Sequence, residues 1–225
     1  MNNKINSLET LRGLAALIVA MYHFPSTSFL FVEGGYLGVY FFFSLSGFVI
    51  ALNYFHVINS YKSLVKFQVK RFFRIYPVHI FVLFLVLGIQ VLKLIALKFF
   101  NLSTDKEAFT PEYWYTLTDF VNHIFLVQAV TNNGYSLSWN SAAWTISTEF
   151  YSYLIFGLIT LCVRNNRLIF IIISLLFIYF FNKIKKINKI NINHLFLGCL
   201  KVILTGCIFF FIYEFFNYII IIYIT

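Results

Sequence analysis

The chain has 225 residues, of which 60% are hydrophobic and 11% are charged, and its mean hydropathy is +0.82. Soluble globular domains are roughly 45–50% apolar and about 25% charged, so this chain has too little polar surface for a soluble particle. Its net charge of +9 does not indicate nucleic-acid binding, because the basic residues lie between apolar runs, as in the cytoplasmic loops of membrane proteins. Composition therefore excludes a soluble domain and predicts an integral membrane protein.

Apolar runs that approach the length of a membrane-spanning helix recur along the chain. About 20 mostly apolar residues are needed to cross the hydrocarbon core of a bilayer. One weaker run, 117–130, is short and contains Asp119 and His123. We predict an all-α fold, a polytopic bundle of transmembrane helices with about six or seven spans, within one domain, residues 1–225. The stronger candidates are 8–24, 36–58, 78–100, 142–163, 168–181 and 195–224.

Charged residues between the spans predict the orientation of the chain. The stretches 61–77 and 182–191 are rich in lysine and arginine and should face the cytoplasm, whereas 101–119 is acidic and should lie outside. This arrangement requires 117–130 to cross the membrane. It places the N-terminus in the cytoplasm and Arg164 and Arg167 outside. The alternatives are that 117–130 is a re-entrant segment or an interfacial helix.

The first apolar run carries Arg12 and His23, eleven positions apart. At roughly 100° per residue they lie on one side of a helix, separated by about 16 Å along its axis. A charged side chain inside a span costs at least about 2.5–3.5 kcal/mol on insertion scales, so such residues usually face a bundle interior or a wet cavity. The pattern indicates either a functional face or two helix-end residues that reach the interfaces.

The second run, GGYLGVYFFFSLSGFVI, is rich in small residues, notably Gly35, Gly38, Ser46 and Gly47. Small residues let two membrane helices approach closely. No Gly-Lys-Ser/Thr ending follows, so the stretch is not a phosphate-binding P-loop. On the residues alone, a helix-packing face is predicted.

Two arginines follow in VKRFFRIYP. Arg71 and Arg74 are three positions apart and therefore lie on one face of a helix, at the cytoplasmic end of the next span. Two guanidinium groups there could bind phosphates through charge-assisted hydrogen bonds. The alternative is the ordinary excess of basic residues in cytoplasmic loops.

A polar stripe is predicted in SLSWNSAAWTISTEFYSY, residues 136–153. Its hydroxyl residues and Glu149 recur at helical spacing along an otherwise apolar helix. A carboxylate inside a membrane is a functional hypothesis by default, with a histidine or arginine on a facing helix as its partner. A structural salt bridge to Arg12 is the alternative. The stripe consists of Ser141, Thr145, Thr148, Glu149 and Ser152.

Taken in order, these segments resemble the acyltransferase 3 family of polytopic membrane acyltransferases. LETLRGLAALIVAMYH resembles the family's first span, with an arginine, ten residues and a histidine, and GGYLGVYFFFSLSGFVI resembles its next span. Arg71, Arg74 and Pro77 match its R-x-x-R before a proline, and WTISTE matches its tryptophan-to-glutamate pattern. The motifs cover 8–153, whereas 164–225 is poor in motifs. Family members are longer, so the resemblance predicts a C-terminally truncated or minimal member.

The resemblance implies transfer of an acyl group, usually acetyl, from acyl-CoA to a hydroxyl of a cell-surface or lipid-linked carbohydrate, such as lipopolysaccharide O-antigen or another polysaccharide. His23 would be the general base, because a neutral imidazole with a pKa near 6.5 suits proton removal. Glu149 would orient His23 or bind the acceptor. Arg71 and Arg74 would bind the phosphates of coenzyme A. Further contacts with donor or substrate would come from Arg12, Trp144 and Ser147.

The expected partners are the acyl-CoA donor, a carbohydrate or glycolipid acceptor and membrane lipid. No bound cofactor is expected, since acetyl-CoA is a donor substrate, and the three cysteines lack the spacing of a metal site. The resemblance places the chain in a bacterial cytoplasmic (inner) membrane. Two other interpretations stay open: a transporter or flippase for a glycan precursor, whose path Arg12, His23 and Glu149 would line, and an inactive remnant.

Overall fold

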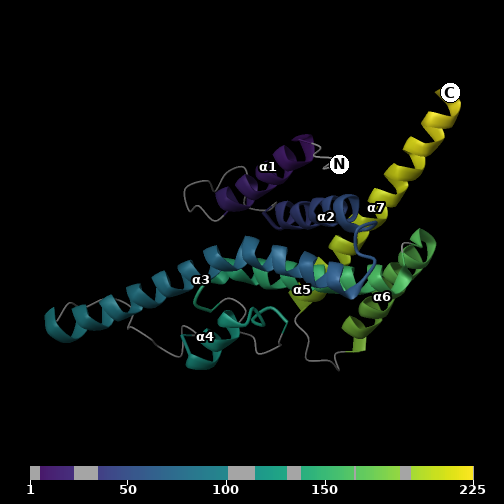
Figure 1. Ribbon diagram of the computed structural model, residues 1–225. Coiled ribbons are helices and arrows are strands. Elements are labelled where there is room, and N and C mark those ends of the chain that lie inside the picture. The colour runs from purple at the N-terminus through teal and green to yellow at the C-terminus, as the bar shows by residue number, and fades with distance from the viewer. Residues whose placement is uncertain are drawn as a thin grey trace. The chain divides into compact units, whose positions relative to one another are not determined.

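The protein is described by a computed structural model that covers residues 6–22, 35–100, 115–130, 138–164, 166–187 and 194–224. All regular secondary structure in these ranges is helical (Figure 1), which confirms the predicted all-α class. The α-helices are α1 (Asn6–Tyr22), α2 (Gly35–Tyr54), α3 (Tyr61–Phe100), α4 (Leu117–Ile124), α5 (Trp144–Val163), α6 (Arg167–Ile187) and α7 (His194–Ile224), with one 3-10 turn, Ser141–Ala143, before α5.

Helix length and hydropathy identify a polytopic membrane protein, as predicted. Among the described residues, 4 stretches are long and apolar enough to cross a bilayer: Leu37–Tyr54, Tyr61–Phe99, Ser141–Val163 and Phe196–Ile220. Helix α1 contributes a shorter apolar stretch, Thr10–Met21, and α6 has 21 residues. About 20 residues suffice for a crossing, so this set approximates the expected number of spans.

The segment 117–130 does not cross the membrane as a helix, and that prediction is wrong. Helix α4 has only 8 residues, which extend about 12 Å against a hydrocarbon core of roughly 30 Å. The chain then turns, with Leu126 at a φ of 57°. Asp119 and His123 are buried while Leu117 is exposed, so the polar side of α4 packs inward and its apolar side faces outward.

The stretch 61–77 was expected to lie between two spans, with Arg71 and Arg74 on a helix at the cytoplasmic end of the next span. In the structure all of it belongs to the 40-residue helix α3. Ser60 and Ser63 cap its start: the Ser63 backbone N–H donates to the Ser60 hydroxyl, and the Ser60 backbone N–H donates to the Ser63 hydroxyl. Lysine and arginine are good helix formers, and the helix continues through Pro77. Charge pattern alone could not distinguish a basic helix from a basic loop.

The chain forms two compact units. Unit 1 comprises residues 1–67, 154–187 and 198–225, and unit 2 comprises 68–153 and 188–197. Helices α3 and α5 each begin in one unit and continue into the other.

In unit 1, glycines set the close contacts of α2. Helix α1 lies beside α2 (Figure 1), with Ile18 and Val19 against Gly38. At the contact of α2 with α7, a Cβ on Gly47 would collide with the carbonyl oxygen of Ile203, and a Cβ on Gly206 would collide with that of Ser44. Only glycine permits this backbone-to-backbone approach.

Unit 1 also gathers several helix ends around Glu214. The Arg167 guanidinium lies 3.1 Å from Glu214 Oε1, and His56 Nε2 lies 3.6 Å from the same oxygen. Gly157 of α5 packs against Leu64 of α3. The end of α2 and the starts of α3 and α6 therefore lie at the same end of unit 1. The expectation that Arg167 lies across the membrane from 61–77 is wrong, because α4 does not supply the crossing that it required.

Candidate active site

Unit 2 brings Arg71 and Glu149 into one chain of contacts through Tyr153. Arg71, on α3, is 8% exposed, and its guanidinium carbon Cζ lies 5.4 Å from the centroid of the Tyr153 ring. The Tyr153 hydroxyl donates a hydrogen bond to Glu149 Oε1. Glu149 and Tyr153 are four positions apart on α5, so their side chains lie on one face of that helix. A cation and a carboxylate of the predicted site thus share one aromatic side chain.

The sequence did not single out Tyr153. The predicted stripe on 136–153 was built from small hydroxyl residues and one carboxylate, and a tyrosine among 15 in an aromatic-rich chain carries little information. The available signal was its spacing of four from Glu149. A cation over an aromatic face contributes about 0.5–2 kcal/mol, more when both groups are desolvated, and Tyr153 is 2% exposed.

The two predicted arginines of α3 have different surroundings. Arg71 packs against α5, whereas Arg74 is exposed. Nearby in unit 2, Gln68 Nε2 donates to the carbonyl oxygen of Phe150 at 3.3 Å, which helps to fix α3 beside α5. The arginine motif therefore has one member inside the helix pair and one at the surface.

Several polar groups at the start of α5 bind the backbone. The Ser147 hydroxyl donates to the carbonyl oxygen of Leu126 and accepts the Ala129 N–H at 3.3 Å. The Thr148 hydroxyl donates to the carbonyl oxygen of Trp144 at 2.9 Å. Trp144 itself is half-buried. Ser147 therefore anchors the turn after α4, and these hydroxyls position α5.

Unit 1 holds the remaining predicted site residues that are described. Arg12 of α1 is half-buried, with its Cζ 5.1 Å from the centroid of the Phe42 ring on α2. Gly35 begins α2, and Ser46 is buried beside Gly47, whose contact with α7 is given above. His23 lies outside the described residues.

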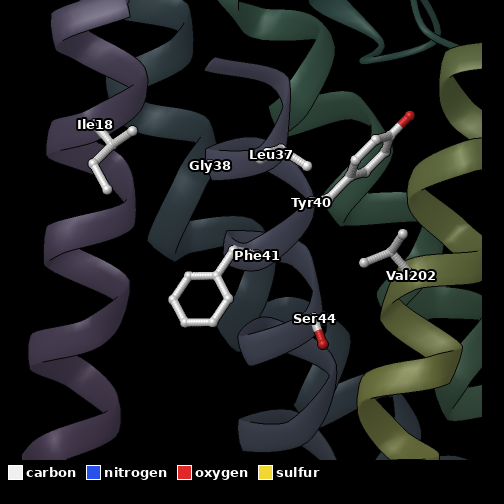
Figure 2. Close-up of a pocket in the computed structure, with 7 residues that line it drawn as sticks. All are labelled: Ile18, Leu37, Gly38, Tyr40, Phe41, Ser44 and Val202. Atoms are coloured by element: carbon white, nitrogen blue, oxygen red, sulfur yellow. The ribbon is translucent and has the colours of Figure 1, made fainter. Parts of the chain in front are cut away.

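Unit 1 also contains an apolar groove of about 600 Å³ between α1, α2 and α7. Figure 2 shows its lining, in which the Tyr40 and Ser44 hydroxyls are the polar side-chain groups. Leu37 and Phe41 are exposed at its walls and belong to a candidate membrane span. The other lining residues are Ile18, Gly38 and Val202.

A buried pair of histidines in unit 2 was not expected as a site. His79 of α3 and His123 of α4 are 1% and 0% exposed, and their ring centroids are 6.0 Å apart. His79 Nε2 lies 2.9 Å from the carbonyl oxygen of His123, and because a carbonyl only accepts, Nε2 carries the proton. His123 Nε2 lies 3.4 Å from the Ser138 hydroxyl. Neither histidine belongs to a sequence motif that would have marked it.

The surroundings of His123 favour its neutral form. Burial, together with repulsion from a protonated His79, lowers the pKa of His123 to about 4, and a hydrogen bond with Ser138 acts in the opposite direction. Within the described ranges, no group of three or more histidine, cysteine or acidic residues is placed to hold a metal ion.

These observations define a polytopic, all-helical membrane protein with an arginine–tyrosine–glutamate contact between two of its helices. Comparison with known proteins specifies the class further. The family model for the acyltransferase domain of the acyltransferase 3 family matches residues 5–224, and the chain belongs to this family.

The chain is also similar to an O-acetyl transferase of Shigella phage Sf6. The two are 28% identical over 189 residues, which is 78% of this chain and 52% of the phage protein. The chain thus spans about half the length of this curated relative. No solved structure matches the chain.

Proposed function

We propose that this chain acts as a membrane-bound O-acyltransferase, which moves an acyl group, in the first place acetyl, from acyl-CoA to a hydroxyl of a cell-surface or lipid-linked carbohydrate. The contact of Arg71 and Glu149 with Tyr153 carries the proposal, because it gathers a cation and a carboxylate of the family motifs in one place. Similarity to an O-acetyl transferase supports acetyl as the group transferred.

The reaction requires a hydroxyl oxygen to attack the thioester carbonyl carbon. The new C–O bond forms as the C–S bond breaks, and the proton of the hydroxyl ends on the thiolate of coenzyme A. His23 is proposed as the group that removes this proton, since neutral imidazole accepts a proton near neutral pH. Glu149 is proposed to bind the acceptor hydroxyl or to orient the base.

Arg71 and Arg74 are proposed to bind the phosphates of the donor. The Arg71 guanidinium carbon Cζ lies over the Tyr153 ring, 5.4 Å from its centroid. The ring contact uses the positive charge of the guanidinium, and a phosphate would be bound by its N–H groups. Arg74 is exposed and suits the part of the donor nearest to solvent. Arg12 is proposed as a further donor contact.

The proposed location is a bacterial cytoplasmic (inner) membrane, with the N-terminus in the cytoplasm. Arg167 and the start of α3 lie at one end of unit 1. This end is rich in lysine and arginine, including Lys62, Lys66 and Arg164. Basic residues favour the cytoplasmic side of a membrane. A donor made in the cytoplasm would approach from that side.

Acetyl transfer by membranes that contain the chain tests the proposal. Membranes supplied with radiolabelled acetyl-CoA should label a polysaccharide or glycolipid fraction, and His23→Ala should reduce labelling at least about 100-fold, the usual contribution of a general base. His56→Ala is the matched control, because His56 contacts Glu214 rather than the proposed site. Equal labelling by wild type and His23→Ala, at equal expression, would contradict the proposed role of His23. Movement of a glycan without labelling would identify a transporter instead.

A further inference from the structure

We propose that Tyr153 is a positioning residue with two separable tasks: its ring holds Arg71 for the donor, and its hydroxyl holds Glu149 for the acyl-transfer step. The inference rests on the proposed function and assigns to it a residue that no sequence motif had marked. It follows from the two contacts described above, one with the face of the ring and one with the hydroxyl.

The two contacts use different parts of one rigid side chain. The ring face attracts the guanidinium through its quadrupole, and this attraction does not require the hydroxyl. The hydroxyl donates to the carboxylate, and a hydrogen bond to a charged group is stronger than one between neutral groups. Removing the hydroxyl alone should therefore take one hydrogen bond from Glu149 and leave the ring contact of Arg71 in place.

Burial makes these contacts effective. Tyr153 is 2% exposed and Arg71 is 8% exposed, so water competes weakly for either group. Ser152, the neighbour of Tyr153 on α5, is 0% exposed. Side chains held in this way have few alternative rotamers, which is the condition for precise placement of groups that bind a substrate.

Two substitutions separate the tasks. Tyr153→Phe should lower kcat about tenfold, because Glu149 loses the hydrogen bond from the Tyr153 hydroxyl. KM for acetyl-CoA should stay within about twofold, because the ring that contacts Arg71 is kept. Tyr153→Leu removes the ring as well and should also raise KM for acetyl-CoA about tenfold. Tyr151→Phe is the matched control: it removes a hydroxyl from the same helix, but that hydroxyl donates to the carbonyl oxygen of Phe125, and activity should be retained.

A double-mutant cycle distinguishes positioning from general damage. If the hydroxyl acts through Glu149, Tyr153→Phe should have no further effect in a Glu149→Gln background. Additive losses, or equal losses in Tyr153→Phe and Tyr151→Phe, would overturn the inference. Thermal unfolding in detergent shows whether Tyr153→Leu folds. If it does not, the double-mutant cycle with Tyr153→Phe still tests whether the hydroxyl acts through Glu149.

Measuring the binding of acetyl-CoA to the purified chain tests the role of Tyr153 without relying on acyl transfer. Titration calorimetry should show weaker binding by Tyr153→Leu and unchanged binding by Tyr153→Phe. A wild type that binds acetyl-CoA but transfers no acetyl group would contradict the proposed activity, and the binding comparison would still test Tyr153. Unchanged binding by Tyr153→Leu would overturn the donor-side task, and a wild type that does not bind acetyl-CoA would overturn both proposals.

Discussion

Single residues decide contacts that neither hydropathy nor periodicity reveals. Tyr153 joins Arg71 to Glu149 because it lies one helical turn beyond the carboxylate and faces α3. Gly47 and Gly206 determine how closely α2 and α7 approach, since each lies against a backbone carbonyl of the other helix. In each case a side chain, or the lack of one, acts through a partner far away in the sequence.

The glycine contact makes a prediction about stability. Gly47→Ala should lower the free energy of unfolding by about 1–3 kcal/mol, because its Cβ has to displace the backbone at Ile203. Thermal unfolding of the detergent-solubilised protein measures this loss.

Gly88→Ala on α3 is the matched control for Gly47→Ala. A Cβ at Gly88 has nothing within 4 Å, and alanine is the better helix former, so this variant should equal or exceed the wild type in stability. A Gly47→Ala protein as stable as Gly88→Ala would contradict the close contact of α2 with α7.

At the scale of elements, the short helix α4 changes the course of the chain. Because α4 does not cross, α5 ends where α3 begins, with Gly157 against Leu64 and with Arg167, which follows α5, bound to Glu214. Arg167 then lies at the same end of unit 1 as the start of α3. This agrees with the preference of basic residues for one side of a membrane better than the predicted order of spans did.

Cysteine labelling checks this topology. In a protein whose native cysteines, Cys162, Cys199 and Cys207, are replaced, Lys62→Cys and Arg164→Cys should react with an impermeant maleimide from the same membrane face. Lys98→Cys, near the other end of α3, should react from the opposite face and serves as the control. Labelling of Lys62→Cys and Arg164→Cys from opposite faces would contradict this topology and show that the segment between α3 and α5 crosses the membrane.

At the scale of the whole molecule, stability depends in part on a buried polar pair within an otherwise apolar chain. Unit 2 contains this pair, His79 and His123 on α3 and α4, whereas the Glu214 contacts with His56 and Arg167 in unit 1 are partly exposed to solvent. Unpaired charge in a buried site is costly, so burial favours the neutral form of His123.

The low pKa of His123 predicts loss of stability in acid. An unfolded chain binds a proton at His123 below its ordinary pKa of 6.5, whereas the folded protein does so only near pH 4. Between these values the unfolded state holds more protons, so the free energy of unfolding falls as pH falls, by roughly 3 kcal/mol over the full window. Unfolding midpoints in detergent between pH 7 and 4.5 measure this slope.

His123→Gln removes the titrating group and should flatten the pH dependence. Ser138 accompanies His123 in this buried site, and Ser138→Ala should keep a slope like that of the wild type because His123 still titrates. An unchanged slope in His123→Gln would show that other groups cause the acid sensitivity.

The sequence by itself determined the class of the protein. Its composition indicates a lipid environment, its apolar runs predict helices, and its motifs in 8–153 identify the family. These properties can be read from the sequence because each depends only on composition or on residues close together in the chain. It did not determine that α4 stops after 8 residues, that α3 is continuous through Pro77, that Arg167 and His56 share Glu214, or that Tyr153 joins Arg71 to Glu149. Only the tertiary structure decided these points, because each depends on which distant side chains meet once the helices pack.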